Sequence, residues 1–208
     1  MRRILLLAFS CSLFLSCQHS PQKNFYYLTA QLVQEPNQAQ SSPTTPEKST
    51  AQTESSKINQ LIGIGPIEVA DYLNRSQIIE NQSNNSLNMA DNAFWAEPLD
   101  KSIARVTALN LTQVNSARNF VYFPWRSDSK PRYSIRVRID ELSRTGNQAK
   151  LSANWELMDN DTKTNLLRKN FTRSTPVDSG AKALAQTYSK LLADLAGEMD
   201  AELNKIPQ

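Results

Sequence analysis

Two neighbouring segments alternate strictly between apolar and polar residues, and this pattern restricts the fold more than any other feature of the sequence. In residues 132–144 the apolar positions are Tyr133, Ile135, Val137 and Ile139. In residues 148–158 they are Ala149, Leu151, Ala153, Trp155 and Leu157. A period of two residues is typical of a strand with one buried face. The short polar link between the segments therefore predicts a hairpin whose apolar face must be covered by other elements.

Two amphipathic helices are predicted, and they can supply this cover. Residues 97–114 place apolar side chains at helical spacing, and Pro98 suits the first turn because its missing N–H group costs nothing there. Residues 179–204 carry a longer apolar stripe along one side of a helix. Asp178, just before this stripe, is the expected N-cap residue.

Shorter apolar segments predict further strands at 24–33, 61–69, 77–82, 86–90, 120–125 and 165–172. Pro66 interrupts the second of these, which predicts a bulge or an edge position because proline donates no ladder hydrogen bond. The third and fourth should form a hairpin. The whole pattern predicts an α/β fold with α+β character: a single domain in which a mixed β-sheet of about five or more strands packs with two long helices.

The beginning of the sequence has the features of a bacterial lipoprotein signal. A short basic start precedes the apolar run 4–15, which is too short to span a bilayer as a mature helix. The run ends in the letters LFLSC, which resemble the lipobox read by lipoprotein signal peptidase. We therefore expect a signal peptide over residues 1–16 and lipid attachment at Cys17. The alternative is a plain secretory signal that happens to contain cysteine, and Cys11 would leave only a few apolar residues before it.

The expected domain organisation follows from changes in composition. Residues 17–23 form a tether, and the first strand occupies 24–33. Residues 34–57 are rich in Pro, Gln, Ser and Thr and contain almost nothing apolar, so we expect this insert to be disordered. Residues 58–206 provide the remainder of the single domain.

Charge and residue inventory exclude several classes of function. The formal net charge of +3 falls to about +1 once the basic leader is removed, which is no footprint for nucleic acid. The only histidine, His19, lies on the tether, so a nucleophile–histidine system lacks its base and we expect no enzyme.

Asp159-Asn160-Asp161 begins like a calcium loop, but Thr164 and Asn170 stand where the glycine and glutamate should be. We read it as a turn, and we expect neither metal nor cofactor.

Four residues are candidates for contact with a partner. Phe123 and Trp125 lie at the end of a predicted strand and form a candidate aromatic contact patch. Arg136 and Arg138 lie on the polar face of the alternating hairpin, where they could attract lipid phosphates or an acidic partner. The alternative for these arginines is an ordinary solvated strand face, paired across the strands with Glu156.

Three segments together resemble a known family. They are Phe25-Tyr26-Tyr27-Leu28, the run from Ile64 to Leu73 and the run from Asn92 to Asp100. In this order and spacing the chain resembles the PqiC (YmbA) kind of lipoprotein, also called ABC-type transport auxiliary lipoproteins, which are outer-membrane partners of MCE-type transporters. The resemblance continues through the alternating hairpin and the terminal helix.

The resemblance implies an accessory role in lipid or phospholipid traffic between the inner and outer membranes. The implied partner is an MCE-domain protein that spans the periplasm, and we also expect a homo-oligomer. Gln18 follows the cysteine where an inner-membrane lipoprotein commonly has Asp, so the resemblance favours the outer membrane. The alternative function is a structural lipoprotein scaffold of another envelope complex.

The lipid-attachment hypothesis can be tested with the two cysteines. We expect Cys17→Ser to abolish incorporation of radiolabelled palmitate and to leave the precursor uncleaved, because the thiol is the acyl acceptor. Cys11→Ser is the matched control and should change neither. Equal palmitate incorporation in the wild type and the Cys17 variant would refute the lipobox assignment.

Overall fold

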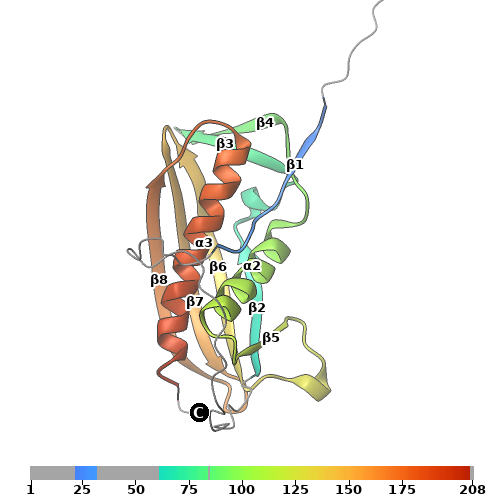
Figure 1. Cartoon of the computed structure of the whole chain (residues 1–208), viewed down its shortest axis with the longest axis vertical. Coiled ribbons are helices and arrows are strands. Elements are labelled where there is room, and N and C mark those ends of the chain that lie inside the picture. Colours follow the sequence, from blue (N-terminus) through green and yellow to red (C-terminus); the bar gives the residue numbers. More distant parts are fainter. Residues whose placement is uncertain (1–21, 32–60, 84, 207–208) are drawn as a thin grey trace, which may run out of the picture.

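The computed structural model describes residues 22–31, 61–83 and 85–206, which form two sheets and two long helices (Figure 1). The five strands of the larger sheet, in spatial order, are β5 (Asn119–Tyr122), β2 (Leu61–Val69), β6 (Tyr133–Thr145), β7 (Gln148–Asp159) and β8 (Thr164–Pro176). The smaller sheet has the order β1 (Asn24–Tyr26), β4 (Ser86–Trp95) and β3 (Gln77–Ser83). The helices are α2 (Leu99–Val114), α3 (Ala181–Leu203) and the short 3₁₀ turns η2 (Asp71–Leu73) and η3 (Ser127–Ser129).

The larger sheet is mixed, as the sequence predicts. β2 runs parallel to both β5 and β6, whereas β7 is antiparallel to both of its neighbours, β6 and β8. The predicted hairpins β6–β7 and β3–β4 are both present. The smaller sheet was not anticipated, since its parallel pair of β1 with β4 joins segments far apart in the sequence.

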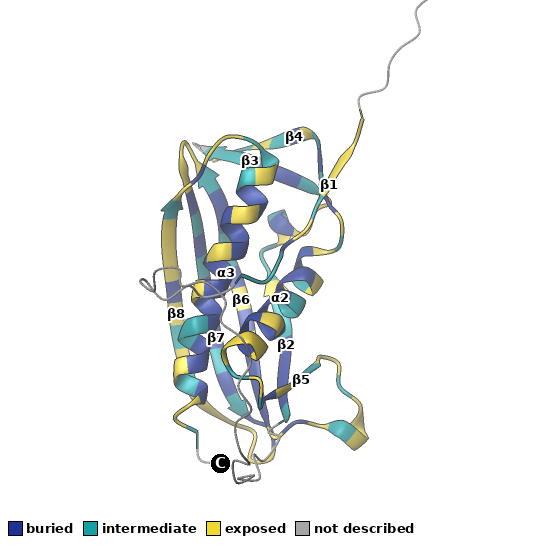
Figure 2. Cartoon of the chain, in the orientation of Figure 1, coloured by how far each residue is buried: buried dark blue, intermediate teal, exposed yellow. Residues whose placement is uncertain are grey.

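Both long helices lie on the same face of the larger sheet (Figure 1). α2 packs against β2 and β5, α3 packs against β7 and β8, and the two helices contact each other. They cover the apolar side of the alternating hairpin, where Ile135, Ile139, Leu151 and Trp155 are completely buried. Figure 2 shows the same division, with buried residues on the inner sides of the helices and exposed residues on their outer sides.

Pro66 produces a bulge in an interior strand. The pairing of β2 with β6 shifts register between Ile64 and Ile67, so the predicted bulge is confirmed. β5 pairs with the other side of β2 only over Leu61–Ile64, so at Pro66 itself no strand in the described residues pairs with that side, and the expected edge position also applies locally. Both features suit proline, which has no N–H group to donate to a neighbouring strand.

The first strand is shorter than predicted. β1 ends at Tyr26, and the described residues after it, 27–31, run between the two helices outside any sheet. Side chains of the helices satisfy this backbone instead: Thr29 N–H donates to Ser189 Oγ (3.1 Å) and Gln31 N–H to Asn110 Oδ1 (2.9 Å). Leu28 is fully buried, so the aromatic and apolar pattern reflects burial rather than strand pairing.

The start of α3 also differs from prediction. Gly180, with φ of +94°, is the N-cap residue, and Asp178 does not cap the helix. The reason is that the chain still belongs to the sheet one residue earlier, where Val177 N–H donates to Asn147 O (2.9 Å). A positive φ favours glycine and lets the backbone turn into the helix at this point. At the other helix, Pro98 precedes the first helical residue, and α2 begins at Leu99 rather than at residue 97.

Several predictions concern residues outside the described ranges. They are the signal peptide 1–16, the lipid attachment at Cys17 and the insert 34–57. These assignments remain predictions.

A buried ion pair fastens the end of α3 to the connection between α2 and β5. Arg118 donates to Asp200 through Nη1 and to Asn204 Oδ1 through Nη2 (2.6 Å), and Asn204 Nδ2 donates to Asp200 Oδ2 (3.0 Å). The side chains of Arg118 and Asp200 are 7% and 9% exposed. Because each charged group satisfies the other, removal of either one would leave an uncompensated buried charge.

We expect Asp200→Leu and Arg118→Leu each to lower the free energy of unfolding by about 3–5 kcal/mol. The double variant should lose less free energy of unfolding than the two single variants lose together, because it leaves no unpaired charge. Urea unfolding followed by circular dichroism measures all three. Additive losses would show that the two side chains do not interact in solution.

Candidate functional site

The face of the larger sheet opposite the helices carries mostly polar side chains. Along β6 and β7 the outward positions alternate with the buried ones, and they include Arg136, Arg138, Asn154 and Glu156. Neither α2 nor α3 covers this side (Figure 1). It is the face on which the sequence places two of its four candidate contact residues.

Two glycines of β2 leave bare backbone on the outer face, and the loop after β5 lies directly on it. A Cβ atom added at Gly63 would be 2.7 Å from Pro131 Cγ and 2.8 Å from Trp125 Cζ3. At Gly65, where φ is +115°, it would be 2.8 Å from Phe123 Cβ. Distances under 3.0 Å are not tolerated without movement, so the loop requires glycine at both positions.

The aromatic residues of this loop hold each other in place. The rings of Phe123 and Trp125 meet edge to face, with centroids 5.2 Å apart and planes at 82°. This geometry is favourable because the positive edge of one ring meets the negative face of the other. Trp125 is partly buried against the sheet, whereas Phe123 remains 48% exposed.

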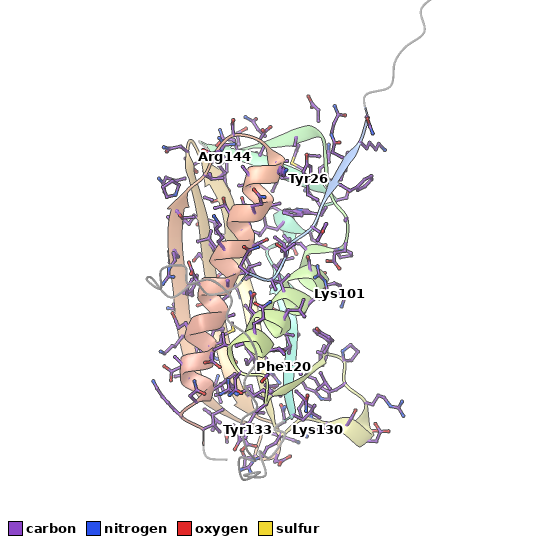
Figure 3. All side chains as sticks on the ribbon, viewed as in Figure 1. Tyr26, Lys101, Phe120, Lys130, Tyr133 and Arg144 are labelled. Atoms are coloured by element: carbon purple, nitrogen blue, oxygen red, sulfur yellow. The ribbon has the colours of Figure 1, made fainter. Side chains whose placement is uncertain are left out.

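The far end of the loop is fastened to the turn between β7 and β8. Asn160 receives a hydrogen bond from Ser134 Oγ (3.1 Å) and donates through Nδ2 to Pro131 O (2.9 Å), and Lys130 Nζ donates to Asn160 O (3.0 Å). Figure 3 shows Lys130 and Tyr133 at this end of the sheet. Asn160 therefore positions the loop, a role that its place in a polar turn did not reveal in the sequence.

The turn itself is confirmed as a turn. The backbone N–H groups of Thr162 and Asp161 donate to the Asp159 carboxylate at 3.1 and 2.9 Å, and these bonds hold the pKa of Asp159 below its usual value. Throughout the described ranges, no group of three or more His, Cys, Asp or Glu side chains is placed to hold a metal ion.

Arg136 and Arg138 line a groove of about 490 Å³ on the outer face, together with Pro66, Glu68, Asn154, Glu156 and Arg168. Arg138 pairs with Asp140 (2.8 Å), and Glu156 pairs with Arg168 (2.6 Å). The alternative interpretation paired the β6 arginines with Glu156, but Glu156 pairs with Arg168 of β8 instead, although Arg136 stands opposite Glu156 in the ladder. Among the described residues neither Arg136 nor Glu68 has an ion-pair partner, and three arginines against two glutamates line the groove.

The structure places the four candidate contact residues on one continuous surface. Phe123 lies against Gly65, and the next residue, Pro66, lines the groove of Arg136 and Arg138. We call this surface the docking face and define it as Pro66, Phe123, Trp125, Arg136 and Arg138. An aromatic end thus adjoins a basic end.

A second cavity opens beside Phe123, at the edge of the sheet where β5 ends. It has a volume of about 500 Å³, and its apolar lining is Ile64, Gly65, Pro66, Ile67, Ala104, Tyr122 and Phe123. The carboxylate of Glu97 pairs with Arg105 at its rim, and this hydrogen bond lowers the pKa of Glu97. Such a pocket has the size and lining that accept an apolar side chain or small ligand.

None of the helices in the described part of the chain is long and apolar enough to cross a membrane. The predicted anchor at Cys17 lies outside these residues.

The fold matches solved structures of other proteins. An uncharacterized protein superposes with a TM-score of 0.66 at 16% identity, covering 88% of this chain and 99% of its own. A Xanthomonas campestris protein of the DUF330 family superposes with a TM-score of 0.62 at 13% identity, covering 86% of this chain and 94% of its own. At these identities the likeness shows the fold alone. No curated protein sequence matches significantly.

The sequence itself defines the family. Residues 42–200 match the family model described as "ABC-type transport auxiliary lipoprotein component". The chain therefore belongs to the ABC-type transport auxiliary lipoprotein family, and the resemblance drawn from its sequence segments is confirmed.

The glycine requirement at the docking face can be tested with one methyl group. We expect Gly63→Ala to lower the free energy of unfolding by about 1–3 kcal/mol, because Trp125 and Pro131 must move away from the sheet. Tryptophan emission should shift to the red, since Trp95 and Trp155 stay buried while Trp125 loses its cover. Thermal melts and fluorescence measure the two effects.

Gly197→Ala is the matched control for this substitution. Gly197 lies within α3, and a Cβ atom there would meet nothing within 4 Å. This change should raise stability by up to about 1 kcal/mol, because alanine favours the helix. A Gly63 variant as stable as this control would contradict the close contact between the loop and β2.

Proposed function

We propose that this chain is an outer-membrane lipoprotein, anchored through Cys17, that serves as the docking element of an MCE-type lipid transport system. Its partner would be the MCE-domain protein that bridges the periplasm. Membership of the auxiliary lipoprotein family supports a transport role, and the docking face supports a role in binding a protein partner. The single observation that carries the proposal is the loop of Phe123 and Trp125, seated on a glycine strand beside a basic groove.

Rigidity is the first argument for a docking role. Trp125 contacts the backbone of β2 at one end of the loop, and Asn160 fixes the other end through two hydrogen bonds, to Lys130 and Pro131. A surface that is already ordered loses little conformational entropy when a partner binds. Exposed aromatic side chains in such surfaces usually contribute much of the binding free energy.

Composition is the second argument. Phe123 and the apolar pocket beside it suit an apolar anchor of the partner, and Arg136 suits a carboxylate at the rim. Protein interfaces are enriched in aromatic residues and arginine, and polar groups usually lie at their rim. The same face can serve contacts between copies of this chain, as expected for a homo-oligomer.

Placement is the third argument. The chain enters the described structure at the end of the molecule where β1 lies, and the loop of residues 123–131 projects at the opposite end (Figure 1). An anchor at the first end would leave this loop, with Phe123 and Trp125, at the end of the domain far from the membrane. A protein that bridges the periplasm would approach from that side.

The proposal predicts which substitutions weaken binding. We expect Trp125→Ala, and separately the double change Arg136→Glu/Arg138→Glu, to lower affinity for the tagged MCE-domain protein by about tenfold or more. Pull-down from detergent-solubilised membranes measures binding, thermal melts check folding, and light scattering measures self-association.

Arg75→Glu/Arg144→Glu is the matched control, since it makes the same charge change at residues outside the docking face. It should bind as the wild type does. Folded Trp125 and arginine variants that still bind fully would exclude the docking face as the interface. Capture of a different envelope complex, with no MCE-domain protein bound, would favour the scaffold function instead.

A further inference from the structure

A groove of about 440 Å³ lies between the N-terminal segment and the first half of α3. Phe25, Tyr27 and Gln31 line it from the segment, and Lys182, Gln186 and Lys190 line it from the helix. Its lining includes no carboxylate. Figure 3 shows Tyr26 beside the first turns of α3, at the end of the molecule opposite the loop of residues 123–131.

The N-terminal segment turns Phe25 and Tyr27 outward, whereas Tyr26 packs against the core. Residues two apart in an extended chain point the same way, which places Lys23, Phe25 and Tyr27 on one side and the buried Leu28 on the other. Phe25 is 63% exposed and Tyr27 is 59% exposed, the largest values among the exposed apolar and aromatic side chains of the described residues. Aromatic rings combined with lysines are typical of surfaces that lie at the boundary of a membrane.

The charges of α3 run against the helix dipole. A helix favours acidic residues at its N-terminal end and basic residues at its C-terminal end. Here Lys182 and Lys190 lie in the first half, and Asp194, Glu198, Asp200 and Glu202 lie in the second. The dipole acts mainly within the terminal turns, where Lys182 at the start and Asp200 and Glu202 at the end are unfavourably placed.

The two halves of α3 also differ in how their charges are matched. Acidic residues of the second half have cationic partners: Asp194 pairs with Arg173 (3.0 Å), and Glu202 pairs with Lys169 (2.6 Å). Lys182 and Lys190 are exposed and have no ion-pair partner within the described ranges of the chain. The basic half therefore suits an anionic surface outside this molecule.

The expected anchor fixes the distance to such a surface. Cys17 precedes Gln22, the first described residue, by five positions, which is at most about 18 Å of extended chain. Lys23, Phe25 and Tyr27 follow immediately. A lipid on Cys17 would therefore hold these side chains within reach of the headgroups.

We propose that Lys23, Phe25, Tyr27, Lys182 and Lys190 form a membrane-contact face. It rests on the phospholipid layer that holds the anchor, with the aromatic rings among the headgroups and the lysines at anionic phosphates. This inference rests on the lipid anchor of the proposed function. It adds an orientation, because contact at this face holds the domain upright and keeps the loop of residues 123–131 away from the membrane.

The test uses the full lipoprotein, purified in detergent and reconstituted into vesicles of phosphatidylethanolamine and phosphatidylglycerol. A Gln186→Cys change allows an environment-sensitive fluorophore to be attached within the face, and Ser127→Cys places the same fluorophore on the distal loop. We expect nitroxide-labelled lipid to quench the fluorophore at position 186 and to leave the one at position 127 unchanged. Equal quenching at both positions, or none at position 186, overturns the proposal.

Charge reversal tests the role of the lysines. Lys182→Glu/Lys190→Glu should lower the equilibrium constant for lipid contact at position 186 by about tenfold or more. Each lysine beside an anionic surface contributes to the attraction. Arg126→Glu/Lys163→Glu, at the opposite end, is the matched control and should have no effect. An unchanged signal in the lysine variant, with a normal thermal melt, contradicts the proposed contact.

Other occupants and other failures give different results. A fluorescence change in detergent micelles that grows with protein concentration would identify a second copy as the occupant and overturn the proposal. Protein that does not float with the vesicles would refute both the anchor and this face. The lysine variant should still bind the MCE-domain protein in detergent, so loss of membrane contact and loss of docking are separate outcomes.

Discussion

The apolar face of β6 and β7 must be covered, and this requirement determines where every other element can lie. Trp155 and its neighbours along the hairpin are completely buried, and only α2 and α3 provide enough apolar surface to cover them. Both helices therefore occupy one side of the sheet, and the N-terminal segment is held between them by Ser189 and Asn110. The buried pair of Arg118 and Asp200 then fixes α3 to the connection that follows α2. The opposite side of the sheet stays available for contacts because neither of the two long helices in the described residues lies on it.

The outer side gains its aromatic patch from an absence of side chains. Gly63 and Gly65 expose the backbone of β2, so Trp125 and Phe123 can approach the sheet more closely than any other residue there would permit. The bulge at Pro66 follows immediately and begins the basic groove. Three consecutive features of one strand thus join an aromatic and a basic surface. At the other end of the molecule, the membrane-contact face depends on β1 and the first half of α3, so the two proposed contacts use separate elements.

The sequence predicted the local elements well and the long-range pairing poorly. Strict alternation identified β6 and β7, because one buried face imposes a period of two on the residues themselves. It could not reveal that β1 pairs with β4, since that pairing depends on tertiary position and not on either segment alone. Phe123, Trp125, Arg136 and Arg138 were identified by type, and the structure places them on one surface. Asn160 and Gly63 were missed, because a polar turn and a glycine in a strand have many explanations until their neighbours are known.

β8 is an edge strand of 13 residues, and its composition affects how copies of this protein meet. Long edges with unpaired backbone groups invite further strands and can start aggregation. Three basic residues lie along β8, and Pro176 is its last residue; the basic residues are Arg168, Lys169 and Arg173. An identical strand laid alongside would bring like charges together, which disfavours the pairing. Copies of this protein can therefore reach high local concentration without their sheets pairing edge to edge.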